Sequence, residues 1–153
     1  MTRTRPANED ALPSSLRQLK QMIDGSQSEI DLGRSHSSGT LSVSGAVRAV
    51  DLICDAELGE HSTAANHRDA TELLATIPGE EHLVGDFSLC QSRKTEFNYH
   101  ASELTIEDAR EVLEAARHLA SEAVGLLTRR GWFPNGESPT DYDFGSAHMG
   151  ADT

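Results

Sequence analysis

Residues 105–131 carry the repeating pattern that most restricts how this chain can fold. Thr105 and Asp108 have the spacing of a capping box, in which each side chain accepts a hydrogen bond from the other residue's backbone N–H. Gly131, which follows two arginines, is typical of a helix end. Between these signals, apolar and small residues recur every three or four positions, at Ile106, Ala109, Leu113, Ala116, Ala120, Ala123 and Leu127. The pattern predicts an amphipathic helix with one buried face.

The same helical period recurs less regularly in the rest of the chain. Helices are expected over residues 13–24, 41–58, 64–77 and 80–102. The Ser- and Gly-rich residues 25–39 are expected to form a linker after a helix stop at Gly25, although Ile30 and Leu32 leave open an extension of helix into them. No segment shows the alternation of a half-buried strand. The sequence therefore predicts an all-α fold, a four- to five-helix bundle of up-and-down topology.

The helical pattern divides the chain into three parts. Residues 1–12 are polar without a period and are expected to be a flexible N-terminus, and residues 13–130 form the helical domain. Residues 131–153 hold neither lysine nor arginine but contain Trp132, Phe133, Tyr142 and Phe144, together with several acidic residues. We expect this tail to dock on a surface, either that of its own bundle or that of a partner.

Charge and composition argue against two classes of protein, avid nucleic-acid binders and membrane-spanning proteins. The net charge is −12, and residues 51–86 contain nine acidic side chains against one basic side chain. Because such a surface repels phosphate backbones, an avid nucleic-acid binder is disfavoured. No apolar run is long enough to span a membrane, and no apolar stretch follows the basic first residues, so we expect a cytoplasmic protein. Cys54 and Cys90 are expected to be buried thiols.

The candidate site is the octet of residues 93–100, Arg-Lys-Thr-Glu-Phe-Asn-Tyr-His. Arg93 and His100 are seven positions apart, close to two helical turns, so they share a helix face. Arginine recognises phosphate and histidine transfers protons near neutral pH, so the pair suits metal-free cleavage of a phosphodiester by an RNA 2′-OH. Asn98 is expected to hydrogen-bond His100 or the substrate, and Tyr99 to stack on a base.

Two properties of the octet favour a simpler interpretation. Seven residues of straight helix separate the Cα atoms of Arg93 and His100 by about 10 Å, so contact of both with one phosphate needs a long reach by the arginine, a distortion of the helix, or a second copy of the motif across a dimer. Glu96 lies three residues after Arg93 and four before His100, and it is therefore able to pair with both on a solvated face. The catalytic and surface ion-pair hypotheses both stay open at this stage.

Several stretches of the chain resemble the prokaryotic HEPN domain family. They are residues 44–53, His67-Arg68-Asp69-Ala70, residues 93–99, and residues 105–109 with Ala115-Ala116 beyond them. Catalytic members carry an arginine, four to six residues and a histidine, and the six residues between Arg93 and His100 fit the longest spacing. The resemblance covers roughly residues 12–129.

The resemblance implies a homodimer in which two such motifs face a shared cleft. It implies that Arg93 and His100 are the catalytic residues, and Asn98 and Tyr99 the substrate-binding residues, of a metal-independent endoribonuclease without a cofactor. It also implies the toxin of a toxin–antitoxin pair, with a nucleotidyltransferase-like antitoxin as partner. Many family members are instead non-catalytic, so an interaction module that binds a protein partner or a nucleotide is the alternative.

One group of possible metal ligands is present, but its pattern is weak. Glu57, Glu60, His61 and His67 bracket a single loop and offer carboxylate and imidazole ligands. They lack the repeated Glu-x-x-His pattern of di-iron bundles, so we expect no metal there, and His67 is expected to cap or pack against the following helix.

Overall fold

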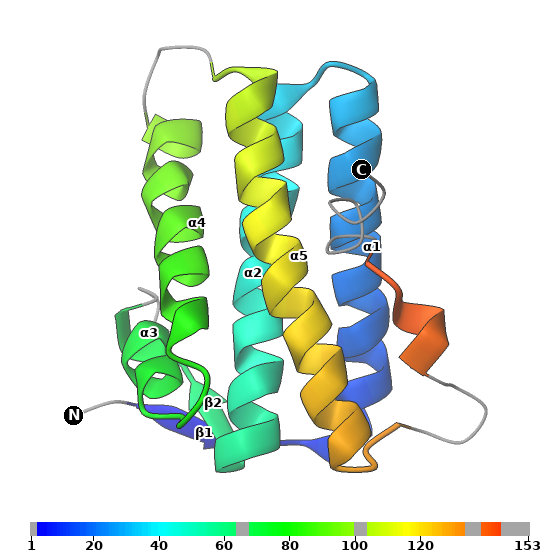
Figure 1. Cartoon of the computed structure of the whole chain (residues 1–153), viewed down its shortest axis with the longest axis vertical. Helices are drawn as coiled ribbons and strands as arrows, with labels where there is room; N and C mark the ends of the chain where they lie inside the picture. The colour runs from blue at the N-terminus through cyan, green and yellow to red at the C-terminus, as the bar shows by residue number, and fades with distance from the viewer. Residues whose placement is uncertain (1–2, 64–67, 100–103, 134–138, 145–153) are drawn as a thin grey trace.

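The computed structural model describes residues 3–63, 68–99, 104–133 and 139–144. The helices in this part of the chain are α1 (Leu12–Asp31), α2 (Ser35–Leu58), α3 (Arg68–Ala75), α4 (His82–Tyr99) and α5 (Ile106–Arg129). The four long helices alternate in direction (Figure 1). The predicted all-α, up-and-down bundle is therefore confirmed.

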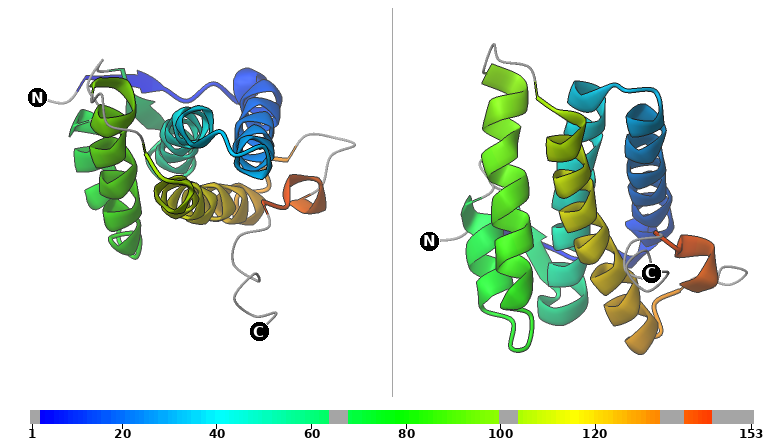
Figure 2. Two further views of the ribbon diagram at one scale, coloured as in Figure 1. Left: turned by 90° about the horizontal axis from the view of Figure 1, so that it is seen from above. Right: turned by 45° about the horizontal axis from the view of Figure 1, so that its top comes forward.

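The core lies around α2 and α5, which pack against each other at the centre of the bundle (Figure 1). Seen from above, α1 lies on one side of this pair and α3 and α4 lie on the other (Figure 2). Every long helix contributes large side chains that are fully buried, among them Leu16, Leu19 and Ile23 of α1, Ile53 of α2, Phe87 of α4, and Leu113, Leu119 and Leu127 of α5. One continuous apolar core therefore positions all four long helices.

Helix α5 begins where the capping box predicts. The Asp108 N–H donates to Thr105 Oγ1 at 3.0 Å, and the Thr105 N–H donates to Asp108 Oδ2 at 3.3 Å. Five alanines of α5 are buried, and small residues at a helix interface let two backbones approach closely. The chain leaves the helix through Gly131, whose φ of 68° is the left-handed conformation of a helix end.

The predicted linker over residues 25–39 is wrong, and the alternative that Ile30 left open, a helix extending into this segment, is confirmed. Helix α1 continues through Gly25 to Asp31, and α2 already begins at Ser35. Gly25 lies at a close approach of the two helices, because a Cβ added there would lie 3.2 Å from Leu41 Cδ1. The hydroxyl of Ser26 lies 2.7 Å from the hydroxyls of both Ser38 and Ser42, and all three side chains are buried. The serines and glycines therefore build the α1–α2 interface.

A small sheet that the sequence pattern did not predict ties the N-terminal residues to the bundle. Strand β1 (Thr4–Pro6) pairs antiparallel with β2 (Glu60–Ser62), with Arg5 opposite His61. Each strand has only three residues, too few for apolar alternation to be visible in the sequence. The 3-10 turn Glu9–Ala11 then leads directly into α1.

The described part of the tail packs against the chain's own bundle. The 3-10 turn Pro139–Tyr142 contacts α5, and the Tyr142 and Phe144 side chains are buried. The Lys20 Nζ of α1 donates to the Asp143 carbonyl at 2.7 Å and lies 5.8 Å from the Phe144 ring centroid. Of the two docking surfaces left open by the sequence, the described tail residues therefore occupy the surface of their own bundle.

Among the described residues, no helix combines the length and the apolar character that a membrane span requires.

Candidate functional site

Arg93 lies in the second half of α4 and its guanidinium is held by carboxylates of two helices. Its Nη1 donates to both carboxylate oxygens of Glu96 at 3.0 Å. Its Nη2 donates to Glu111 Oε1 of α5 at 3.1 Å and lies 3.5 Å from Asp108 Oδ1. We call Arg93, Glu96, Asp108 and Glu111 the α4–α5 ion cluster.

The cluster fixes the charge and direction of the arginine. The hydrogen bond to Glu111, together with the charges of Glu96 and Asp108, raises the pKa of Arg93 above its ordinary value. Only 24% of the Arg93 side chain is exposed, so its terminal N–H groups are shared among carboxylates rather than presented to solvent. A phosphate would have to displace these partners before it could bind the planar fork.

The structure shows the side-chain contacts of only some of the predicted site residues. Arg93 and Glu96 form the ion pair expected from their spacing, while Asn98 and Tyr99 lie in the last turn of α4. The side chains of Asn98 and Tyr99, and His100 as a whole, lie outside the described part of the structure. The contribution of Asp108 and Glu111 was missed, because it depends on how α4 and α5 face each other.

No family model, curated protein or solved structure matches this chain.

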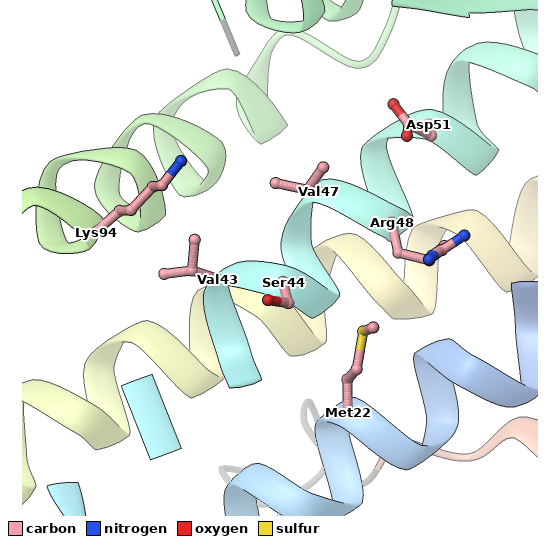
Figure 3. A pocket seen from close by; sticks show the side chains of 7 residues that line it. All are labelled: Met22, Val43, Ser44, Val47, Arg48, Asp51 and Lys94. Atoms are coloured by element: carbon pink, nitrogen blue, oxygen red, sulfur yellow. The ribbon is translucent and has the colours of Figure 1, made fainter. Parts of the chain in front are cut away.

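A second candidate site is a groove of about 370 Å³ between α1, α2 and α4. Its lining combines the apolar Met22, Val43 and Val47 with the polar Ser44, Arg48, Asp51 and Lys94. Figure 3 shows Lys94 approaching from α4 and Arg48 from α2, on opposite sides of the two valines. This surface was not recognised in the sequence, because its residues come from three helices.

The cations of the groove, unlike Arg93 of the α4–α5 ion cluster, are not held in ion pairs within the described part of the chain. Neither Arg48 nor Lys94 forms an ion pair with a described residue, although Lys94 directly follows Arg93 in the sequence. Burial raises the pKa of Asp51 to about 6, against the opposing charges of His61 and of Arg48, which lies near this carboxylate. The groove therefore presents two cations, and its one carboxylate is partly neutralised near pH 6.

Of the four loop residues considered as metal ligands, Glu57, Glu60 and His61 are described by the structure and do not form a cluster of metal-ligating atoms. Glu57 Oε2 accepts from Arg130 Nη2 at 2.7 Å, His61 Nδ1 lies 2.7 Å from Asp55 Oδ1, and His67 lies outside the described residues. A different set, Glu80, His82 and Glu122, does place one potential ligand atom of each residue within 4.8 Å of the others. Burial, followed by the facing Glu122, raises the pKa of Glu80 to about 8.

The thiols do not provide a nucleophile. Cys54 and Cys90 are buried, as predicted, and burial raises the pKa of each to about 12. Because the thiolate is the reactive form of cysteine, both residues act as core side chains near neutral pH.

Proposed function

We propose that this chain is a HEPN-like, non-catalytic binding module that holds a nucleotide in the groove between α1, α2 and α4. The observation that carries the proposal is the contrast between two neighbouring cations of α4. Arg93 is bonded to carboxylates, whereas Lys94 lines the groove with Arg48 and has no ion pair to a described residue. In a chain of net charge −12, two cations in one groove, of which only Arg48 has a nearby carboxylate, Asp51, favour the binding of an anion there.

The shape and lining of the groove suit a nucleotide. Its volume of about 370 Å³ lies within the usual range for small-molecule sites of about 300–1,000 Å³. Met22, Val43 and Val47 offer an apolar wall for a base, and Arg48 and Lys94 offer donors for phosphate oxygens. The Ser44 hydroxyl and the Asp51 carboxylate provide polar groups for a sugar or a base edge.

Calorimetric titration with AMP, GMP and ATP tests the proposal. Arg48→Ala and Lys94→Ala should each weaken the affinity by at least about tenfold, since a hydrogen bond to a charged group contributes about 1.5–3 kcal/mol. Arg110→Ala is the matched control, because it removes the same charge from an exposed arginine of α5 that pairs with Glu107. Absence of binding by the native chain, or an equal loss in the control, contradicts the proposal.

The second candidate is the metal-independent endoribonuclease of a HEPN-like homodimer. The spacing of Arg93 and His100 favours it, and a toxin role with a nucleotidyltransferase-like antitoxin in the cytoplasm would follow from it. RNA cleavage at pH 7 in EDTA, compared between the native chain, Arg93→Ala and His100→Ala, provides the test. Cleavage that both variants abolish favours this candidate over the binding module, whereas equal cleavage by all three, or none by any, rejects it.

A further inference from the structure

Three side chains of types that can ligate a metal meet at the end of the bundle opposite to the α1–α2 turn. Glu80 precedes α4, His82 is the first residue of α4, and Glu122 lies on the last turns of α5. One carboxylate oxygen of each glutamate and one imidazole nitrogen lie within 4.8 Å of one another. Ligand atoms around a tetrahedral Zn²⁺ with bonds of about 2.0 Å lie about 3.3 Å apart, so small side-chain rotations would close the set around one ion.

The burial of Glu80 distinguishes this group from an ordinary cluster of surface carboxylates. Its side chain is only 6% exposed, and its Oε2 atom is buried with no N–H or O–H donor among the described residues, while the Glu122 carboxylate faces Glu80 within hydrogen-bonding reach of a shared proton. A buried carboxylate oxygen without a donor is costly, because it has lost water and gained nothing in exchange. Either a proton shared with the facing carboxylate of Glu122 or a bound cation would supply the positive charge that this oxygen lacks, so a metal ion would take the place of that proton.

The charged residues around Glu80 only partly compensate its negative charge. Glu57 adds a further negative charge to the neighbourhood of Glu80, but its own carboxylate is bonded to Arg130 at 2.7 Å. Arg129 is close enough to oppose the negative charge on Glu80, yet it forms no ion pair with a described residue. The space that a cation could occupy lies among the ligand atoms of Glu80, His82 and Glu122.

We infer that Glu80, His82 and Glu122 form a binding site for a divalent transition-metal ion, with Zn²⁺ as the best match. The imidazole is a borderline ligand and the two carboxylates are hard ligands, and this mixed set suits Zn²⁺ or Mn²⁺ better than Ca²⁺ or Mg²⁺, which prefer oxygen ligands alone. Three protein ligands leave a fourth position for water, which gives the ion an ordinary tetrahedral shell. Bound there, the ion joins the start of α4 to the end of α5.

The test is a titration of the untagged, metal-stripped chain with ZnCl₂ at pH 7.5, followed by calorimetry and by thermal unfolding. We expect one high-affinity site, and a rise in Tm of about 5 °C or more when free Zn²⁺ exceeds the Kd a hundredfold. Glu80→Gln should abolish the rise, and His82→Ala and Glu122→Gln should weaken the affinity by at least about tenfold each. MgCl₂ at the same concentrations should produce no such rise.

Two control variants keep the outcome interpretable. Glu81→Gln removes an exposed carboxylate next to Glu80, and His118→Ala removes an exposed histidine that lies 3.5 Å from Asp86 and 3.3 Å from Glu114. Both controls should keep the high-affinity site. The inference is overturned if the native chain takes up no stoichiometric Zn²⁺, or if Glu80→Gln folds and binds Zn²⁺ as tightly as the native chain.

Discussion

Replacing Arg93 with alanine separates the structural and catalytic interpretations of the octet. In the structure, Arg93 bonds Glu96 and Glu111 at 3.0 and 3.1 Å and lies 3.5 Å from Asp108. Exposed ion pairs contribute about 0.2–1 kcal/mol each, and these three share one partly buried arginine. Because pairs that share a residue are not additive, we expect Arg93→Ala to lower the free energy of unfolding by about 1–2 kcal/mol.

Urea unfolding followed by circular dichroism measures this loss, and Arg110→Ala provides the control. Arg110 is also an arginine, but its side chain is 57% exposed and its ion pair is with Glu107 alone. We expect that control to lose less than about 0.5 kcal/mol. Raising the NaCl concentration to about 1 M should reduce the loss in Arg93→Ala, because salt screens partly exposed charges.

An RNA-cleavage assay of the same two variants separates a structural role of Arg93 from a catalytic one. If Arg93 is a structural clamp between α4 and α5, its replacement lowers stability and changes no nuclease activity beyond the fraction that has unfolded. The opposite result is a variant with native stability that has lost RNA cleavage. That result would refute the clamp and restore the catalytic hypothesis for Arg93.

Three further predictions concern packing and protonation. Ser26→Ala should lower the free energy of unfolding in urea by about 1–3 kcal/mol, because it leaves the buried hydroxyls of Ser38 and Ser42 without their shared partner. Replacing all three serines with alanine should lower it by less, because no buried hydroxyl is then left unpaired. Asp51 has a raised pKa of about 6, so between pH 4 and 6 the folded state holds a proton that the unfolded state releases. The free energy of unfolding, measured from pH 4 to 7, should therefore fall as the pH rises, and it should fall less in Asp51→Asn. Phe144→Ala should cost about 3 kcal/mol and expose the tail to limited proteolysis, because this ring is buried on the bundle.

Local signals in the sequence were sufficient to predict that the helices exist, but not where each one ends or what it contacts. The start of α5 was predictable because Thr105 and Asp108 bond to each other's backbone within one turn. The continuation of α1 past Gly25 could not be predicted in the same way, because the favourable interactions of Ser26 are with α2. A Ser- and Gly-rich segment is typical of a linker unless a second helix satisfies its hydroxyls, and the sequence of the segment alone does not reveal that helix.

The same distinction applies to the candidate sites. The ion pair of Arg93 with Glu96 follows from a spacing of three within one helix, and it was expected. The bond from Arg93 to Glu111 and the meeting of Glu80 with Glu122 join residues on different elements. The orientation of α4 relative to α5 decides both contacts, and apolar periodicity fixes which helix face is buried but not which polar residues oppose each other at its edge.

The groove and the proposed metal site are far enough apart on α4 to be tested separately. His82 and Lys94 are twelve residues apart on this helix, which corresponds to about 18 Å along its axis. At physiological ionic strength the Debye length is about 8 Å, so direct interaction between charges at the two sites is largely screened. An effect of Zn²⁺ on nucleotide affinity would therefore have to pass through a shift of α4 against α2 and α5. Since Phe87 and Cys90 anchor α4 in the core between the two sites, we expect that shift to be small and the two binding reactions to be independent.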